Sequence, residues 1–136
     1  MNRYLVVTLI AVVAIFLSRG QKFKTYSPDA VTEEKLTKIL EGTQDKVLLY
    51  FWQPDSSSSN AMNPLVDQVA KEYAKKLTVV KIDTSDIDNK AVHDLYHVNA
   101  TPTFIVVQKG KIVSQWVGPF RDKALMLTFL RPSGSY

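Results

Sequence analysis

The chain from Val47 to Pro64 reads VLLYFWQPDSSSSNAMNP. Its first six residues are all apolar or aromatic, which is typical of a central strand buried on both faces. A segment of proline, aspartate and serine follows, of the kind that forms loops and caps helices. Apolar residues then recur every three or four positions, which predicts a helix over residues 60–76. A strand, a polar loop and an amphipathic helix in this order indicate an α/β fold.

Strands and helices alternate along the rest of the chain. Helices are predicted at 30–41, 90–97 and 122–130, and strands at 77–83, 103–108 and 111–116, with a short edge strand at 23–26. Lys109-Gly110 is a two-residue hairpin signal. A helix joins the first two core strands, so these should be parallel, whereas the last two should form a hairpin. The predicted fold class is α/β with a mixed central sheet.

Composition indicates one folded domain. The chain has 136 residues, 46% of them hydrophobic and 22% charged, so it is long enough to bury a core. It has no cysteine, which excludes disulfides, thiolate metal sites and thiol nucleophiles within the chain. The sequence also suggests no metal site and no cofactor.

The net charge of +4 belongs to the N-terminal segment. Residues 1–27 hold four basic residues and no acid, whereas residues 28–136 hold thirteen basic and thirteen acidic residues. The globular part therefore gives no general indication of nucleic-acid binding. Basic residues beside an apolar run are more typical of contact with a membrane surface.

That apolar run is the stretch 4–18, YLVVTLIAVVAIFLS, which carries no charge. As a helix it would be about 22 Å long, and the flanking Arg3 and Arg19 could extend its reach toward the two interfaces. The alternative is a cleaved signal peptide, although no A-x-A cleavage pattern follows the run. We expect residues 1–20 to be an uncleaved anchor contacting the membrane through residues 4–18, and 21–28 to be a polar tether.

Several segments, in order and at matching spacing, resemble the thioredoxin family over residues 29–131. They are the opening stretch 47–64, LTVVKIDTSD at 77–86, YHVNATPTFIVVQKGKIV at 96–113 and WVGPF at 116–120. The resemblance implies a three-layer sandwich, a cis-proline at Pro102, a helix-kinking proline at Pro64 and the family's late glycine at Gly118. Residues 132–136 are then a tail.

The departures from the family fall in its active site. The family's Cys-x-x-Cys pair corresponds to Ser56 and Ser59 in this chain, and the tryptophan before that pair corresponds to Asp55. The family's buried acid corresponds to Tyr50, whereas the lysine partner of that acid is present as Lys81. Dithiol chemistry needs a thiolate that attacks a disulfide sulfur, and a serine hydroxyl cannot replace it. The positions Ser56 and Ser59 are therefore vestigial, and no catalytic residue is expected.

Two other sites have two interpretations each. The serine run could supply a nucleophile, but no G-x-S-x-G elbow surrounds it, and Asp55 or Ser56 is better explained as a helix cap. His93 and His97 have the i, i+4 spacing that can place two metal ligands on one helix face. No third ligand is apparent, which favours a solvated surface.

A peptide-binding surface could persist without sulfur. In the family the cis-proline loop pairs with an extended substrate segment, a form of strand addition. The resemblance places this surface at Trp52, Pro54, Asp55, Ser56, Ser59, Thr101 and Pro102. The alternative is that Pro102 is retained only as a turn that stabilises the fold.

The sequence therefore predicts a single-pass, membrane-anchored thioredoxin-like protein that is redox-inactive and acts as a binding, assembly or structural subunit of a membrane complex. The first alternative is a tethered thiol–disulfide oxidoreductase whose two cysteines are replaced by Ser56 and Ser59. The second is a secreted domain released by signal cleavage. The positive-inside rule leans weakly to a cytoplasmic domain, whereas the resemblance to anchored thioredoxins leans to the extracytoplasmic side.

Overall fold

A computed structural model describes residues 25–26 and 32–131 of the chain. The predicted anchor at residues 1–20 and the tail at 132–136 lie outside the described residues. Within the described ranges, no helix is both long enough and apolar enough to cross a bilayer.

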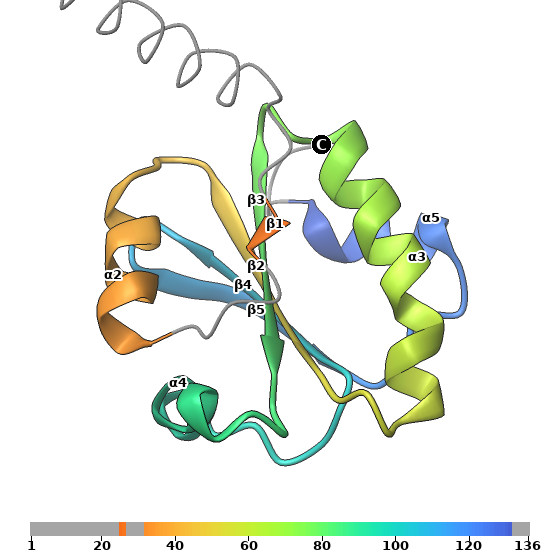
Figure 1. Ribbon diagram of the computed structural model, residues 1–136. Coiled ribbons are helices and arrows are strands. Elements are labelled where there is room, and N and C mark those ends of the chain that lie inside the picture. The colour runs from red at the N-terminus through yellow and green to blue at the C-terminus, as the bar shows by residue number, and fades with distance from the viewer. Residues whose placement is uncertain (1–24, 27–31, 132–136) are drawn as a thin grey trace, which may run out of the picture.

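Five strands form one mixed sheet in the order β1-β3-β2-β4-β5 (Figure 1). Their bounds are β1 Thr25–Tyr26, β2 Lys46–Trp52, β3 Leu77–Asp83, β4 Thr103–Gln108 and β5 Lys111–Val117. β2 pairs parallel with β3 and antiparallel with β4, and β4 pairs antiparallel with β5. The parallel pair and the hairpin predicted from the sequence are both confirmed.

The described residues also form four α-helices and one 3-10 turn. They are α2 Glu33–Glu41, α3 Ser57–Glu72, η1 Ile87–Asn89, α4 Lys90–Leu95 and α5 Lys123–Leu130. Three of the helices begin at a polar side chain that accepts a backbone N–H three residues on, namely Thr32, Ser56 and Asp122. Such caps satisfy N–H groups that have no partner inside the helix, which fixes where each helix starts.

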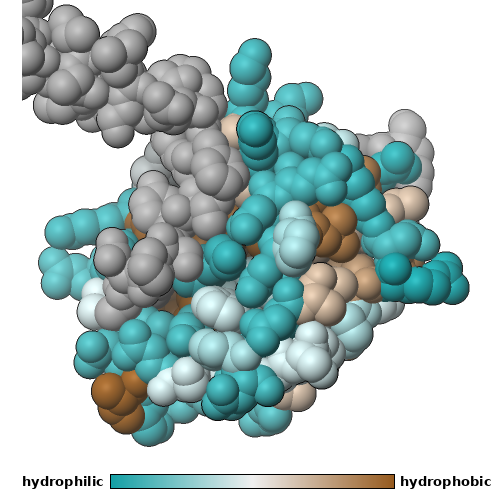
Figure 2. Space-filling view, turned by 45° about the vertical axis from the view of Figure 1, so that its right-hand side comes forward, coloured by the Kyte–Doolittle hydropathy of each residue, from teal (hydrophilic) through white to brown (hydrophobic). Residues whose placement is uncertain are grey.

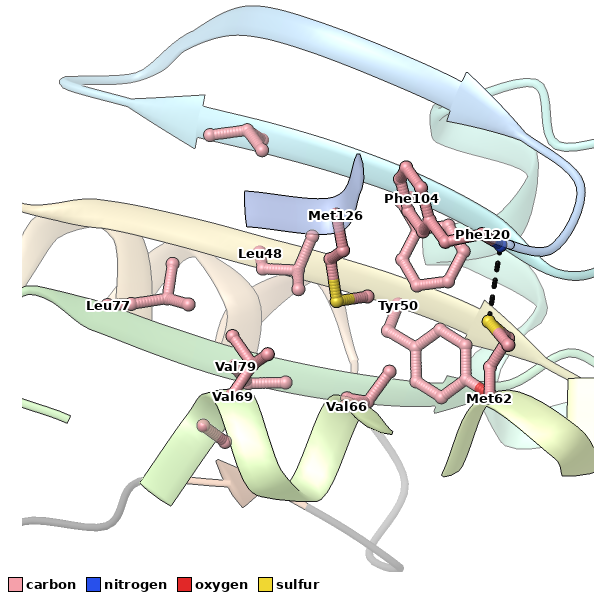
Figure 3. Packing of buried hydrophobic residues seen from close by; sticks show 12 residues of the cluster. Leu48, Tyr50, Met62, Val66, Val69, Leu77, Val79, Phe104, Phe120 and Met126 are labelled. Atoms are coloured by element: carbon pink, nitrogen blue, oxygen red, sulfur yellow. Dashed lines mark hydrogen bonds between the residues drawn. The ribbon is translucent and has the colours of Figure 1, made fainter. Parts of the chain in front are cut away.

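The helices cover both faces of the sheet, which gives the predicted three layers. On one face α3 and α5 bury a cluster that includes Leu48, Phe104 and Met126 (Figure 3). On the other face α2 and α4 contribute Leu36 and Val92 to a second cluster. The central strands are buried from both sides, which accounts for their uninterrupted apolar sequence. The outer surface in the view of Figure 2 is mostly hydrophilic, with apolar side chains in small separate areas.

Several predicted helix boundaries were wrong. α2 begins at Glu33 and not at residue 30, because Thr32 caps it, and α3 ends at Glu72, four residues before the predicted end. α3 begins at Ser57, three residues before the predicted start, because Ser56 caps it and the following serines form its first turn. α4 ends at Leu95, and His97 lies beyond it with a φ of 53°. His93 and His97 therefore do not share a helix face, and the spacing that suggested a metal pair is not realised in the structure.

The sheet has two ends that differ in what they carry. We call the end where β2 and β3 finish and β4 begins the site end, because Trp52 and Pro102 lie there. The opposite end, where β2 and β3 begin and the β4–β5 turn lies, is called the basic end for reasons given below.

Candidate functional site

The loop after β2 is held to its neighbours at the site end. Thr84 donates its backbone N–H to the Trp52 carbonyl at 2.9 Å, and the Asn60 side-chain amide donates to the Pro54 carbonyl. Pro54 and Asp55 are exposed, and Trp52 is half-buried. Of the predicted site residues, Pro54 and Asp55 are thus placed on the surface, on a loop fixed at both of its ends.

Ser56 is the N-cap of α3. Its Oγ accepts the backbone N–H of Ser59 at 3.2 Å and lies 3.1 Å from the Oγ of Ser58. The prediction that Asp55 or Ser56 caps this helix is confirmed, with Ser56 as the cap. The Ser56 hydroxyl is used as the helix cap, and no histidine is among its hydrogen-bond partners. Among the described residues, no neighbouring base therefore activates it as a nucleophile.

Ser59 is fully buried in the first turn of α3. Its Oγ has no hydrogen-bond partner among the described residues. A buried hydroxyl without a partner is uncommon, since it loses the hydrogen bonds it would make with water. A thiol makes weaker hydrogen bonds and behaves as a small apolar group, so the environment of Ser59 suits sulfur better than oxygen.

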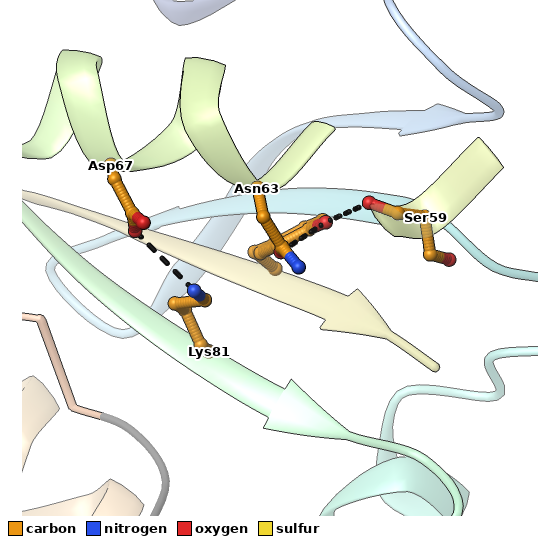
Figure 4. Close-up of polar contacts among 5 residues, drawn as sticks. Ser59, Asn63, Asp67 and Lys81 are labelled. Carbon is orange, nitrogen blue, oxygen red and sulfur yellow. Dashed lines mark hydrogen bonds and ion pairs between the residues drawn. The ribbon is translucent and has the colours of Figure 1, made fainter. Parts of the chain in front are cut away.

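Tyr50 fills the position at which the resemblance places a buried acid. Its ring is buried and stacks on Phe104 with 5.1 Å between centroids. Its hydroxyl lies 2.7 Å from the carbonyl oxygen of Ser59 and 2.9 Å from the side-chain oxygen of Asn63 (Figure 4). Burial, and then the nearby charge of Asp67, raises the pKa of Tyr50 above its usual range. Tyr50 therefore stays protonated near neutral pH and serves as a hydrogen-bond donor to α3.

Because position 50 holds a tyrosine and not an acid, Lys81 contacts other side chains. Its ammonium lies 3.3 Å from the Asp67 carboxylate (Figure 4) and 5.5 Å from the centre of the Trp52 ring. The lysine expected from the resemblance is present, but its ionic partner comes from α3. Both groups that would handle a proton in dithiol exchange are thus committed to holding α3 against the sheet.

Thr101-Pro102 has a cis peptide bond, as the resemblance implied. Pro102 is buried and its carbonyl accepts the N–H of Gly118 at 2.8 Å. Thr103 pairs with Phe51 across β4 and β2, so Thr101 lies near the end of β2 at the site end. Within the described ranges, no hydrogen bond engages the backbone N–H or carbonyl of Thr101.

The structure brings the predicted site residues to one end of the sheet without joining them directly. In the part of the chain that it describes, no hydrogen bond links residues 53–59 to residues 99–102. Two contributors were missed at the sequence level, Asn60 and Asn63, which bind the Pro54 carbonyl and the Tyr50 hydroxyl. The signal that could have found them is polar residues recurring in the first turns of a helix whose other side is apolar.

Removing the cap tests the structural role of Ser56. The Ser56→Ala protein should lose about 1 kcal/mol of unfolding free energy, because the Ser59 N–H loses its acceptor. Urea denaturation followed by circular dichroism measures the change. Ser57→Ala is the matched control, since Ser57 is exposed and caps nothing, and it should shift stability by less than about 0.5 kcal/mol. Equal losses in the two variants would contradict the cap.

Most of the chain is similar to known proteins. The thioredoxin family pattern matches residues 27–131. Thioredoxin M4, chloroplastic, of Arabidopsis thaliana is 32% identical over 104 residues, which cover 76% of this chain and 52% of that protein. Thioredoxin of Pyropia yezoensis is 28% identical over 102 residues, which cover 75% of this chain and 94% of that protein. An X-ray structure of Fasciola hepatica thioredoxin has a TM-score of 0.66 at 21% identity, covering 79% of this chain and 95% of that one.

These likenesses differ in what they support. The structural match supports the fold alone, since its sequence identity is low. The matched part of the chain spans about half the length of the Arabidopsis relative and nearly all of the Pyropia one. The family pattern covers strands β2 to β5, the loop at Ser56 and the cis-proline. This chain, which has no cysteine, belongs to the thioredoxin family.

Proposed function

We propose that this protein is a membrane-anchored, thiol-free member of the thioredoxin family that binds an extended polypeptide, as a subunit or assembly factor of a membrane complex. Thr101 is the observation that carries peptide binding. Its backbone donor and acceptor have no partner among the described residues, and it lies where β4 begins beside β2. An extended segment can pair with such free backbone groups, as in strand addition.

Charge at the site end supports a basic peptide. The loops at this end and the residues that border them carry five aspartates and three cations, namely Asp55, Asp83, Asp86, Asp88, Asp122, Lys90, Arg121 and Lys123. Two of these cations, Lys90 and Lys123, are ion-paired with Asp94 and Glu72. A peptide with lysines on alternate residues would place its cations on one side while its backbone pairs with Thr101. Ser56 contributes through the loop it holds, since its hydroxyl is already used as the cap.

Binding can be tested by NMR with a short synthetic peptide of alternating valine and lysine. Titration into the full chain in detergent should shift the Thr101 amide and the Trp52 indole signals, because both lie at the site end. The Gly110 amide, in the turn at the opposite end, is the internal control and should not move. The same peptide with N-methyl groups on alternate amides keeps its side chains but loses its donors. Equal shifts with both peptides would contradict backbone pairing.

Membrane anchoring is supported by the uncharged stretch 4–18 and the basic residues beside it. Anchored thioredoxins, which this chain resembles, favour the extracytoplasmic side, and we propose that side for the domain. Two arginines in place of Ile10 and Val13 should release the protein into a carbonate wash, since a charge at the centre of a spanning helix costs about 2.5–3.5 kcal/mol.

Ile112→Arg/Val113→Arg is the matched control for this experiment, because it makes the same two chemical changes at exposed positions of the domain. It should leave the protein in the membrane pellet. The mass of the native protein gives a second measurement. A mass lacking about the first twenty residues would show a cleaved signal peptide and contradict the anchor.

The second candidate function is a tethered thiol–disulfide oxidoreductase with cysteines at positions 56 and 59. The buried and unpartnered Oγ of Ser59 favours it, because a thiol would suit that environment. Sequencing the native gene at these two codons separates the candidates. Serine codons support the thiol-free protein, and cysteine codons support the oxidoreductase.

A further inference from the structure

The charges of the domain are divided between the two ends of the sheet. The segments at the basic end carry six cations and three carboxylates, namely Lys46, Lys75, Lys76, Lys109, Lys111, Arg131, Glu41, Asp45 and Glu72. The site end has five aspartates and three cations, two of which are paired with other acids, as described above. The domain sums to zero charge in sequence, yet it has a positive end and a negative end.

The cations of the basic end are not paired with acids. The lysines that form ion pairs in the described residues are Lys38, Lys81, Lys90 and Lys123, all outside this group. Lys46 donates to the carbonyl of Leu130 at the end of α5, which is a neutral acceptor. Lys76 and Arg131 are exposed and have no carboxylate partner in the part of the chain that the structure describes. Positive charge is therefore available here for an anionic partner.

A pocket of about 580 Å³ opens at the same end. Tyr73, Leu127 and Leu130 give it apolar walls. Three cations, Lys46, Lys76 and Arg131, and one carboxylate, Asp45, also line it. Apolar walls beside several cations suit a molecule that carries a phosphate and a hydrocarbon part. A phospholipid has this chemistry.

β1 shows on which side the N-terminal segment joins the domain. It runs parallel to β3, with Thr25 opposite Val79, so the chain enters β1 from the basic end. Six residues, 19–24, separate the stretch 4–18 from Thr25, and fully extended they span at most roughly 20 Å. Three of these six, Arg19, Lys22 and Lys24, are basic, and none is acidic.

We infer that the basic end docks onto the anionic phospholipid surface beside the anchor, with headgroup phosphates at Lys46, Lys76 and Arg131. The inference rests on the membrane anchor proposed above and adds an orientation to it. Turning the domain over would bring its negative end to a negative surface, which is unfavourable within a Debye length. The Thr101 site then faces away from the bilayer, where a polypeptide partner can reach it.

The absence of cysteine makes a direct test possible, since one introduced cysteine gives one label. Gln44→Cys places a fluorophore at the basic end, and Asn99→Cys places the matched one at the site end, both at exposed positions. The full chain is reconstituted in nanodiscs that contain a headgroup-linked quencher. In phosphatidylcholine with about one-third phosphatidylglycerol, quenching of the Gln44 label should exceed that of the Asn99 label about threefold.

Three changes should abolish this difference. They are neutral phosphatidylcholine discs, about 0.5 M NaCl, and the charge reversal Lys76→Glu/Arg131→Glu. Lys35→Glu/Lys38→Glu carries the same change of charge on α2 and should retain the difference. Circular dichroism is used to check that each variant is folded; Lys38, Lys76 and Arg131 are exposed, and Lys35 is half-buried.

Failure of the inference and failure of the anchor give different results. Equal quenching of both labels in anionic discs, with the protein still bound to neutral discs, overturns the docking and leaves the anchor standing. If the protein binds anionic discs but not neutral ones, the anchor is overturned and the lipid contact is retained. If it binds neither kind of disc, the anchor and the docking are both overturned. In a further outcome, quenching of the Gln44 label does not depend on lipid charge but changes when residues 132–136 are deleted. That result assigns the pocket to the chain's own C-terminus and overturns the inference.

Discussion

The Ser56→Cys/Ser59→Cys protein is expected to reduce insulin disulfides with dithiothreitol at least about tenfold faster than the no-protein blank, whereas the parent chain should match the blank. The parent has no thiol to attack a disulfide. A cysteine at position 56 would lie at the N-terminus of α3, where the helix dipole stabilises a thiolate. A cysteine at position 59 would occupy a buried site in which the present hydroxyl has no partner among the described residues.

The Ser56→Ala/Ser59→Ala protein is the matched control and should stay at the blank. Ser56→Cys alone should form mixed disulfides without releasing them, because no second thiol resolves them. If the double cysteine variant folds and still matches the blank, the site has lost more than its thiols. Acceleration by the parent chain would overturn the prediction that it is redox-inactive.

Tyr50→Ala should lose about 3–5 kcal/mol of unfolding free energy, the cost of removing a large buried aromatic side chain. The ring fills the space between β2 and Phe104, and its hydroxyl binds the Ser59 carbonyl at 2.7 Å. Urea or guanidinium denaturation of the full chain in detergent measures the loss. The effect would show that the residue in place of the family's acid now holds the first turn of α3.

Tyr50→Phe is the matched control, because it keeps the ring and removes the hydroxyl. It should lose about 1–3 kcal/mol, since a buried carbonyl loses its donor. Equal losses in the two variants would mean that the hydrogen bond dominates and the packing does not. If Tyr50→Phe loses no stability, the contact of the hydroxyl with α3 does not explain why this position holds a tyrosine.

The central strands could be predicted from the sequence because burial on both faces leaves an uninterrupted apolar run. The strands predicted at 77–83 and 103–108 have those same bounds in the structure, and β2 differs by one residue. The serine run was harder to interpret, because serine suits a loop, a cap and a first helical turn alike. Only the hydrogen bond from Ser59 to Ser56 decides among them.

The contacts of the candidate site could not be predicted in the same way. Tyr50 meets Ser59 and Asn63 because β2 and α3 pack face to face, and nothing local to position 50 indicates this. The division of charge was hidden by a net charge of zero over residues 28–136. The order of elements could have exposed it, since basic residues such as Lys46 and Lys76 stand at strand starts and acids such as Asp83 at strand ends.

The shortness of β1 has a consequence for how far the domain can move. Two residue pairs hold it to β3, so it can detach at a free energy well below that of global unfolding. While β1 is paired, six residues separate it from the stretch 4–18, a reach of roughly 20 Å. Once it detaches, the residues between that stretch and Thr32 number thirteen and reach about 45 Å. Local opening of one small strand would thus more than double the radius within which an anchored domain can search for its partner.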